Sequence, residues 1–239
     1  HYAKADQLFA PDDAERPALL KDRAWLHIHR GEWAKAEADL TLALALAAAW
    51  PDSLQTRRQR ADIHNAFSGL YRRQARYEPA IAHAQEALAL RETLGDAALI
   101  ADSHNSLGLI YAEMGEPQSA IRAYTEALAI YRKMGYQERI ASTCLNLGGA
   151  HYYAGRYDQA IALYQSGLDI FIRLQLPRGQ AEAHYNLAEA YSARGETDQA
   201  RQHWQRGVEQ SRREGLKDLL ERFEELRKNL SAEAVRSDT

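Results

Sequence analysis

The sequence has 239 residues, of which 46% are hydrophobic and 26% charged, and its formal net charge is −3. This balance, without a block of lysines or arginines, argues against a nucleic-acid partner. The longest mostly apolar run, from Leu40 to Trp50, is about half as long as a bilayer span, so no membrane segment is expected.

The number of cysteines predicts the cellular compartment of the protein, and the first residue predicts that the sequence is a fragment. Cys144 is the single cysteine, which excludes an internal disulfide and favours a reducing, cytoplasmic setting. No charged and apolar leader with a cleavage site is found at the start. Because the chain starts at His1 and not at methionine, we expect it to be cut from a longer protein.

The first sixty residues are the least regular part of the chain. Residues 1–14 are expected to be the end of a preceding repeat helix. Residues 15–60 match the repeat that follows if the offset is stretched to 44 residues, which aligns Gly31 with Ala75 and Ala36 with Ala80. The extra residues fall in a polar connector that begins with Trp50 and Pro51. We therefore expect a degenerate repeat here.

Four repeats of 40 residues follow without a gap, over residues 61–100, 101–140, 141–180 and 181–220. The twentieth residue of each is alanine, and the twenty-seventh is alanine or glycine, as shown by Ala80, Ala120, Ala160, Ala200, Ala87, Ala127, Gly167 and Gly207. A strict period of this length is typical of a solenoid, in which each repeat buries its apolar face against its neighbours.

Each repeat contains two helices. Between Leu107 and Met114 the apolar residues recur at spacings of three and four, and Gly115 stands where a left-handed residue ends a helix. A second apolar pattern runs from Pro117 to Gly135. Ala75 takes the place of Gly115 in the first full repeat, which predicts a less sharp helix end. No stretch alternates like a strand, so the fold class is all-α.

Residues 221–239 lack the small-residue signature of the repeats. The segment from Glu221 to Glu233 has a heavily charged face and is expected to be a capping helix that shields the last apolar surface. The final six residues are expected to be disordered.

The packing positions of each repeat resemble those of the tetratricopeptide repeat family; in the second repeat they are filled by Leu107, Gly108, Tyr111, Ala120, Tyr124 and Ala127. The repeats are about six residues longer than usual, like the subclass in kinesin light chains and bacterial signalling ATPases. The resemblance implies an α-α superhelical solenoid of about five helix-turn-helix repeats, with a C-terminal capping helix. It also implies an interaction module with no cofactor.

Three histidines and a cysteine share the fourth position of the repeats: His64, His104, Cys144 and His184. This set suggests zinc, whose ligands must converge within a few ångströms of each other. Equivalent helices of successive repeats are about 8–10 Å apart, so the four side chains cannot meet at one ion. We expect packing residues and no metal site.

Asparagines recur nearby, at the fifth position in Asn65 and Asn105 and at the sixth in Asn146 and Asn186. In the tetratricopeptide family, positions 2, 5, 6, 9, 12 and 13 of the first helix face a concave groove. An amide can both donate and accept, so the resemblance implies a ladder that holds the main chain of a bound peptide. The alternative is helix capping or bonding between helices.

The same resemblance assigns further residues to the groove. Arg72 and Arg73 would form a basic patch, and Tyr152, Tyr153 and Tyr185 an aromatic one. Gly69 and Gly149 would leave pockets, while Glu113 and Glu189 would add acid. Such a gradient suits a partner that is acidic at one end and apolar at the other. The alternative is that the charged residues are merely solvated.

No catalytic motif is present: the chain has no P-loop, no HExxH and no GxSxG. His151 stands seven residues after Cys144 on one helix, about 10 Å away along its axis, too far to activate a thiol. We expect no enzyme.

The leading hypothesis is a module that binds a protein or an extended peptide in its groove, as part of a larger signalling or regulatory protein. The alternative is a ligand-sensing domain attached to a signalling ATPase or transcription regulator, with a small molecule held by the tyrosines. A third hypothesis has the array join protomers through its exposed flank.

Overall fold

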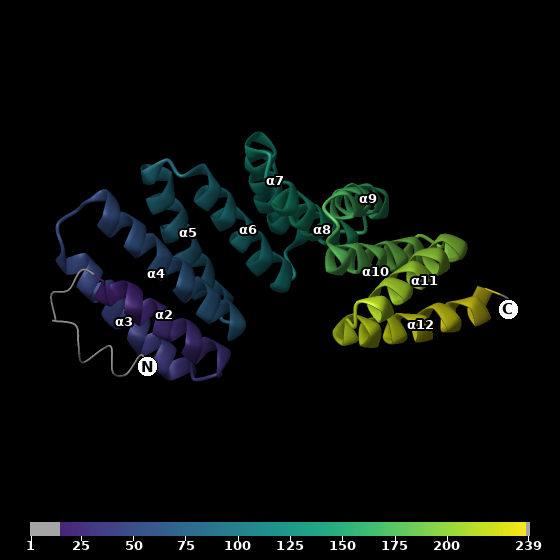
Figure 1. Ribbon diagram of the computed structural model, residues 1–239, viewed down its shortest axis with the longest axis horizontal. Coiled ribbons are helices and arrows are strands. Elements are labelled where there is room, and N and C mark those ends of the chain that lie inside the picture. The colour runs from purple at the N-terminus through teal and green to yellow at the C-terminus, as the bar shows by residue number, and fades with distance from the viewer. Residues whose placement is uncertain (1–14, 238–239) are drawn as a thin grey trace. The chain divides into compact units, whose positions relative to one another are not determined.

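The computed structural model describes the backbone of residues 15–237 and the side chains of residues 15–228. Every regular element in this part of the chain is a helix (Figure 1). The chain forms two compact units, divided between Met114 and Gly115. The predicted end of a preceding helix in residues 1–14 lies outside the described residues. The all-α prediction is confirmed.

The N-terminal unit contains helices α2 (Arg16–His29), α3 (Trp33–Ala49), α4 (Leu54–Arg73), α5 (Tyr77–Leu94) and α6 (Ala97–Glu113). Each helix packs against the next one in the chain, and α2 also packs against α4. The connector before α4 ends in a capping box, in which the Ser53 side chain accepts from the Thr56 backbone N–H.

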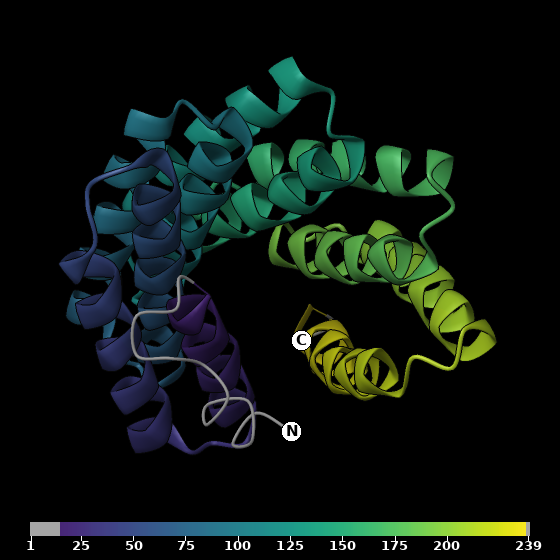
Figure 2. The ribbon, with the colours of Figure 1, turned by 60° about the vertical axis from the view of Figure 1, so that its left-hand side comes forward.

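The C-terminal unit contains α7 (Pro117–Met134), α8 (Gln137–Tyr153), α9 (Tyr157–Arg173), α10 (Pro177–Ala193), α11 (Thr197–Arg213) and α12 (Lys217–Ser237). Here too successive helices pack together, and α10 contacts both α8 and α12. The second view shows the C-terminal unit that contains α8, α10 and α12, in green to yellow (Figure 2). They are the first helices of successive repeats.

The repeat period follows from the helix lengths. From α5 to α11, helices of 17 or 18 residues alternate with connections of two or three residues, which gives the 40-residue spacing. The predicted repeats start at Ala101, Ala141 and Ala181, one helical turn inside α6, α8 and α10. The repeat frame of the sequence analysis thus begins one helical turn inside each of these first helices.

Residues in the left-handed region end the helices, and glycine fills most of these places. Ala75 takes the same conformation, with φ 56°, and its N–H donates to the Arg72 carbonyl at 2.9 Å. The expectation of a less sharp helix end at Ala75 was therefore wrong. The hydrogen bonds of the turn hold an alanine where the left-handed region costs about 1–2 kcal/mol.

Small residues let the helices approach closely. Ala80, Ala120, Ala160 and Ala200 are fully buried. A Cβ atom on Gly207 would lie 2.1 Å from the ring of Phe223, so the absent side chain makes room for the aromatic ring of α12. The predicted small positions are thus the places where neighbouring helices meet.

The last helix docks through one face only. Leu219, Phe223 and Leu226 are buried, while Arg227 and Lys228 are exposed where the earlier first helices bury an apolar or small residue. A polar face is what a capping helix needs, and the capping role of this helix stays a prediction. Helix α12 starts four residues before the predicted boundary at Glu221 and runs to Ser237, into the segment expected to be disordered.

Replacing Ala75 with glycine should stabilise the protein. Relief of the left-handed strain outweighs the extra freedom that glycine gives the unfolded chain, so we expect a gain of about 0.5–1 kcal/mol. Thermal unfolding followed by circular dichroism measures it. Ala82→Gly, on the exposed side of α5, is the control and should destabilise by about 0.5–1 kcal/mol. If Ala75→Gly and Ala82→Gly changed the stability equally, the left-handed strain at Ala75 would be contradicted.

Candidate functional site

The first helices of the repeats have a buried face and an accessible face. Positions 1, 3, 7, 8 and 10 are buried in all four regular repeats. Positions 2, 6, 9, 12 and 13 are half-buried or exposed in all four, and position 5 is half-buried in all but the third, where Leu145 is buried. The side chains assigned to the groove therefore stand on the accessible face of the first helices in each unit, which we call the first-helix surface of that unit.

In the C-terminal unit this surface contains a hollow with about 490 Å³ of space, part of it open to solvent. It is lined by Ser142, Leu145, Asn146, Phe171, Glu182, Asn186 and Arg222. Six of these residues come from the first helices α8, α10 and α12, at positions 2, 5 and 6 of the repeat frame. The hollow is thus built from equivalent positions of three successive repeats.

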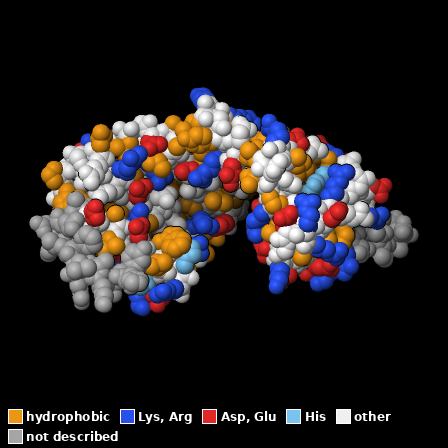
Figure 3. All heavy atoms as spheres, in the orientation of Figure 1, with side chains coloured by type: hydrophobic (Ala, Val, Ile, Leu, Met, Phe, Trp, Pro, Cys, Tyr) orange, Lys and Arg blue, Asp and Glu red, His pale blue; other side chains and the backbone are white. Residues whose placement is uncertain are grey.

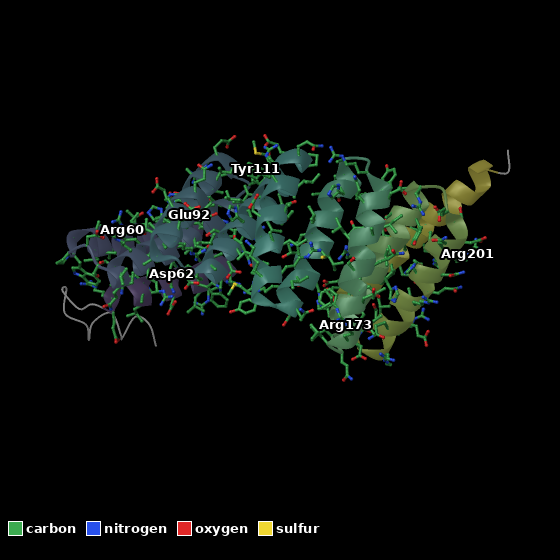
Figure 4. All side chains as sticks on the ribbon, turned by 90° about the horizontal axis from the view of Figure 1, so that it is seen from above. Arg60, Asp62, Glu92, Tyr111, Arg173 and Arg201 are labelled. Atoms are coloured by element: carbon green, nitrogen blue, oxygen red, sulfur yellow. The ribbon has the colours of Figure 1, made fainter. Side chains whose placement is uncertain are left out.

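Phe171, from α9, is the remaining lining residue. Its ring fits beside Gly179, where a Cβ atom would lie 2.4 Å away. In the N-terminal unit the equivalent residue is Arg91, which is buried and donates to the Ser103 hydroxyl at 2.7 Å and to Asp62 at 3.4 Å. Asp62 lies on α4 (Figure 4). At this position of the repeat, a charged side chain fills the space in the N-terminal unit, whereas an aromatic ring borders the hollow in the C-terminal unit.

The predicted asparagines fall into two pairs. Asn146 and Asn186 both line the hollow and are half-buried. Asn65 and Asn105 are half-buried on α4 and α6 of the N-terminal unit. The change from the fifth to the sixth position coincides with the division of the chain into units.

The predicted basic patch is partly neutralised. Arg72 forms an ion pair with Glu113, on the first helix of the next repeat. Arg73 is exposed. Acidic and basic side chains are interspersed over the molecular face seen in Figure 3. The partners of individual charged groups therefore matter more than any broad patch.

The predicted tyrosines occupy two places. Tyr153 is 78% exposed, and its ring meets the edge of Tyr152 at a centroid distance of 5.4 Å. Tyr185 packs instead against Phe223 of α12, at 5.4 Å, and its hydroxyl donates to Glu189 at 3.0 Å. Burial raises the pKa of Tyr185 to about 12, so the hydroxyl keeps its proton at neutral pH. Burial also raises the pKa of Glu189.

Two of the histidines at the fourth position, His64 and His184, have partners that the sequence analysis missed. Nδ1 of His64 lies 2.9 Å from Nδ1 of His83, and Nδ1 of His184 lies 3.0 Å from Nδ1 of His203. At such distances one ring nitrogen donates and the other accepts. Each pair joins the two helices of one repeat. The two pairs stand three periods apart in the sequence, a signal that could have revealed them.

Burial lowers the pKa of all four histidines, and that of His184 falls to about 4, with His203 and Arg206 as further causes. Within residues 15–228 no three His, Cys, Asp or Glu side chains converge as metal ligands. Among the described helices, none has the length and apolar character needed to cross a bilayer.

Helix pairs that repeat every 40 residues and leave one surface of each first helix accessible define a helical-repeat interaction protein. The tetratricopeptide repeat family model matches residues 59–133 and 139–213, more than half of the sequence. The chain therefore belongs to the tetratricopeptide repeat family, and the resemblance stated above is confirmed.

Solved structures share the fold. BtubC (BKLC) from P. vanneervenii is 24% identical with a TM-score of 0.74, over 83% of this chain and 80% of that chain. A Signal Transduction ATPase with Numerous Domains with a tetratricopeptide repeat sensor, from Pyrococcus horikoshii, is 16% identical with a TM-score of 0.73, over 88% of this chain and 31% of that chain.

A third structure is the Rap conjugation gene regulator of the plasmid pLS20 in complex with the Phr* peptide. It is 17% identical with a TM-score of 0.61, over 82% of this chain and 53% of that chain. At these identities the three structures show the fold alone. No curated protein sequence matches the chain at a significant level.

The histidine pairs should make the stability of the protein depend on pH. A histidine whose folded pKa lies below its unfolded value, about 6.5, binds fewer protons than the unfolded chain does. The stability that it contributes is therefore present above pH ~6.5 and is lost as the pH falls towards the folded pKa, about 4 for His184.

The double change His184→Gln and His203→Gln should flatten the decrease of the unfolding temperature between pH 7 and pH 4, as measured by circular dichroism. A comparison at pH 8 separates the lost ring contact from the lost titration. An unchanged slope would show that this pair is not a source of the pH dependence.

Proposed function

We propose that the chain is a non-catalytic module that binds an extended peptide segment of a partner protein on its first-helix surface. The hollow of the C-terminal unit is the proposed site for the peptide main chain. The observation that carries the proposal is that two asparagines from successive repeats, Asn146 and Asn186, line one hollow.

The spacing of the repeats suits an extended chain. First helices of successive repeats pack about 8–10 Å apart, and an extended peptide advances about 3.3 Å per residue. Asparagines on neighbouring helices can therefore hold main-chain groups about three residues apart. Because an amide binds N–H and C=O groups alike, this contact holds a peptide with little dependence on its sequence.

The fold likeness to a regulator solved with a peptide bound supports the proposal. The buried Cys144 fits the reducing, cytoplasmic setting that we propose with it. The remaining predicted residues, Asn65, Asn105, Arg73 and Tyr153, would extend contacts along the first helices of each unit.

A second candidate is a sensor array within a larger signalling ATPase or transcription regulator. The likeness to the sensor-bearing ATPase favours it, and this chain spans 31% of that protein. Both candidate functions use the same accessible surface. In the second candidate, the bound ligand also releases an attached effector domain. A ligand-induced thermal shift with small metabolites, without binding of any linear peptide, would favour the second candidate.

The first candidate is tested by selecting linear peptides from a displayed random library on the immobilised chain. The double change Asn146→Ala and Asn186→Ala should weaken binding of a selected peptide by about tenfold or more, since each lost hydrogen bond costs about 1 kcal/mol. Fluorescence anisotropy measures the dissociation constant, and circular dichroism checks helicity.

The matched control removes two amides from a second helix. Gln202 and Gln205 are both exposed on α11, and their replacement with alanine should leave peptide affinity unchanged. The proposal is overturned if no linear peptide is selected, or if the asparagine variant binds as tightly as the original chain.

A further inference from the structure

The histidine pair of the N-terminal unit has the spacing of two ligands of one metal ion. Nδ1 of His64 on α4 lies 2.9 Å from Nδ1 of His83 on α5. Imidazole nitrogens bind Zn²⁺ at about 2.0–2.1 Å, so two neighbouring ligands of one ion lie about 2.9–3.4 Å apart. The sequence analysis excluded an ion shared by the fourth positions of successive repeats, whereas this pair lies within a single repeat. The two nitrogens can therefore bind one ion at nearly their present separation.

The two rings are held in place and are in the neutral form that binds a metal ion. The His83 ring stacks on Phe67 at a centroid distance of 4.5 Å and lies 5.5 Å from the ring of Tyr71. Burial lowers the pKa of His64 and His83, so both imidazoles are neutral at neutral pH. The ring that donates its Nδ1 proton in the pair can carry that proton on Nε2 instead, which frees its Nδ1 lone pair without a change of charge.

A carboxylate stands beside this pair. Glu86 is exposed and follows His83 by three residues on α5, so the two side chains share one face of that helix. Against the lowering by burial, the negative charge of Glu86 raises the pKa of both histidines, while Arg60 on α4 (Figure 4) lowers that of His64. Among residues 15–228 no three such side chains converge as metal ligands, so Glu86 reaches an ion between the rings only after rotation of its side chain.

The second histidine pair has the same geometry with the opposite charge beside it. Nδ1 of His184 lies 3.0 Å from Nδ1 of His203, and the ring centroids are 5.2 Å apart, against 5.1 Å in the first pair. Arg206 takes the place that Glu86 has in the first full repeat. Burial lowers the pKa of both rings, and the positive charge of Arg206 lowers it further. A cation therefore faces this pair where a carboxylate faces the first.

We propose that His64, His83 and Glu86 form a binding site for a divalent transition-metal ion such as Zn²⁺. The two Nδ1 atoms and one carboxylate oxygen supply three ligands, and water completes the coordination. A histidine and a glutamate three residues apart on one helix can bind the same ion. Imidazole ligands favour Zn²⁺ over Mg²⁺ and Ca²⁺, which prefer oxygen. The bound ion ties α4 to α5. The inference is independent of peptide binding, because the site lies between the two helices of one repeat.

The test is calorimetric titration of the chelator-treated chain with Zn²⁺ alone. We expect one ion to bind per chain and the unfolding temperature to rise with the Zn²⁺ concentration, because the unfolded chain lacks the site. His83→Gln should abolish this binding. Glu86→Gln should weaken it by about tenfold or more, since even partners outside the coordination sphere contribute that much to metal affinity.

The second pair provides a matched control and a constructive test. The double change His184→Gln and His203→Gln removes two histidines of the same geometry and should leave Zn²⁺ affinity and stoichiometry unchanged. Arg206→Glu places a carboxylate beside this pair, at the position of Glu86, and should raise the stoichiometry from one ion to two. Circular dichroism confirms that each variant keeps its helicity.

Three results would overturn the metal site. The first is the absence of Zn²⁺ binding at millimolar concentration, and the second is binding that persists in His83→Gln. The third is an unchanged affinity in Glu86→Gln, which remains informative if the histidine variant fails to fold, because Glu86 is exposed and its replacement leaves the packing intact. None of these results bears on peptide binding, which the asparagine variant tests separately.

Discussion

The structure depends on the close approach of neighbouring helices at alanines and glycines. Where Gly148 lies against the Tyr164 ring, a Cβ atom would come within 2.6 Å, and Gly207 makes similar room for Phe223. Each such contact places a large ring in a space that a small residue leaves open, which buries apolar area without a void. Because these positions recur at a fixed spacing, every repeat must turn the same side of its first helix towards its neighbours. The accessible side is fixed by the same requirement.

From this constraint it follows that the residues of the accessible surface vary between repeats, while the packing residues do not. Positions 2, 5, 6 and 9 carry no packing duty common to all repeats, so they hold acids, amides, aromatic rings or glycine. The replacement of Arg91 by Phe171 at equivalent positions shows the effect on shape, since the arginine fills its site by pairing with Asp62 and the ring borders a hollow. Substitutions at a few positions therefore give the repeats accessible surfaces of different shape and charge, although their backbone fold is the same.

The periodic features could be predicted from the sequence, and the contacts between helices could not. The 40-residue spacing identified the small residues and the accessible positions, because both follow from helix geometry alone. The histidine pairs were missed because His83 and His203 face their partners from another helix, a relation that periodicity within one helix does not reveal. Arg222 was missed for a similar reason: its helix was interpreted as a cap, although its second position faces the same hollow as Asn186. The left-handed Ala75 shows a further limit, since the turn's hydrogen bonds override the residue's own preference.

Helix α12 forms one wall of the hollow, and this couples the occupancy of the hollow to the folding of that helix. The wall is complete only while Phe223 stays in the gap at Gly207, which holds α12 against α11. A ligand that fills the hollow would bind the docked state of α12 and not the detached one, so it would shift the local opening equilibrium towards docking. The amide hydrogens of α12 would then exchange more slowly with solvent, far beyond the residues that the ligand covers. Hydrogen exchange in α12 would thus reveal whether the hollow is occupied.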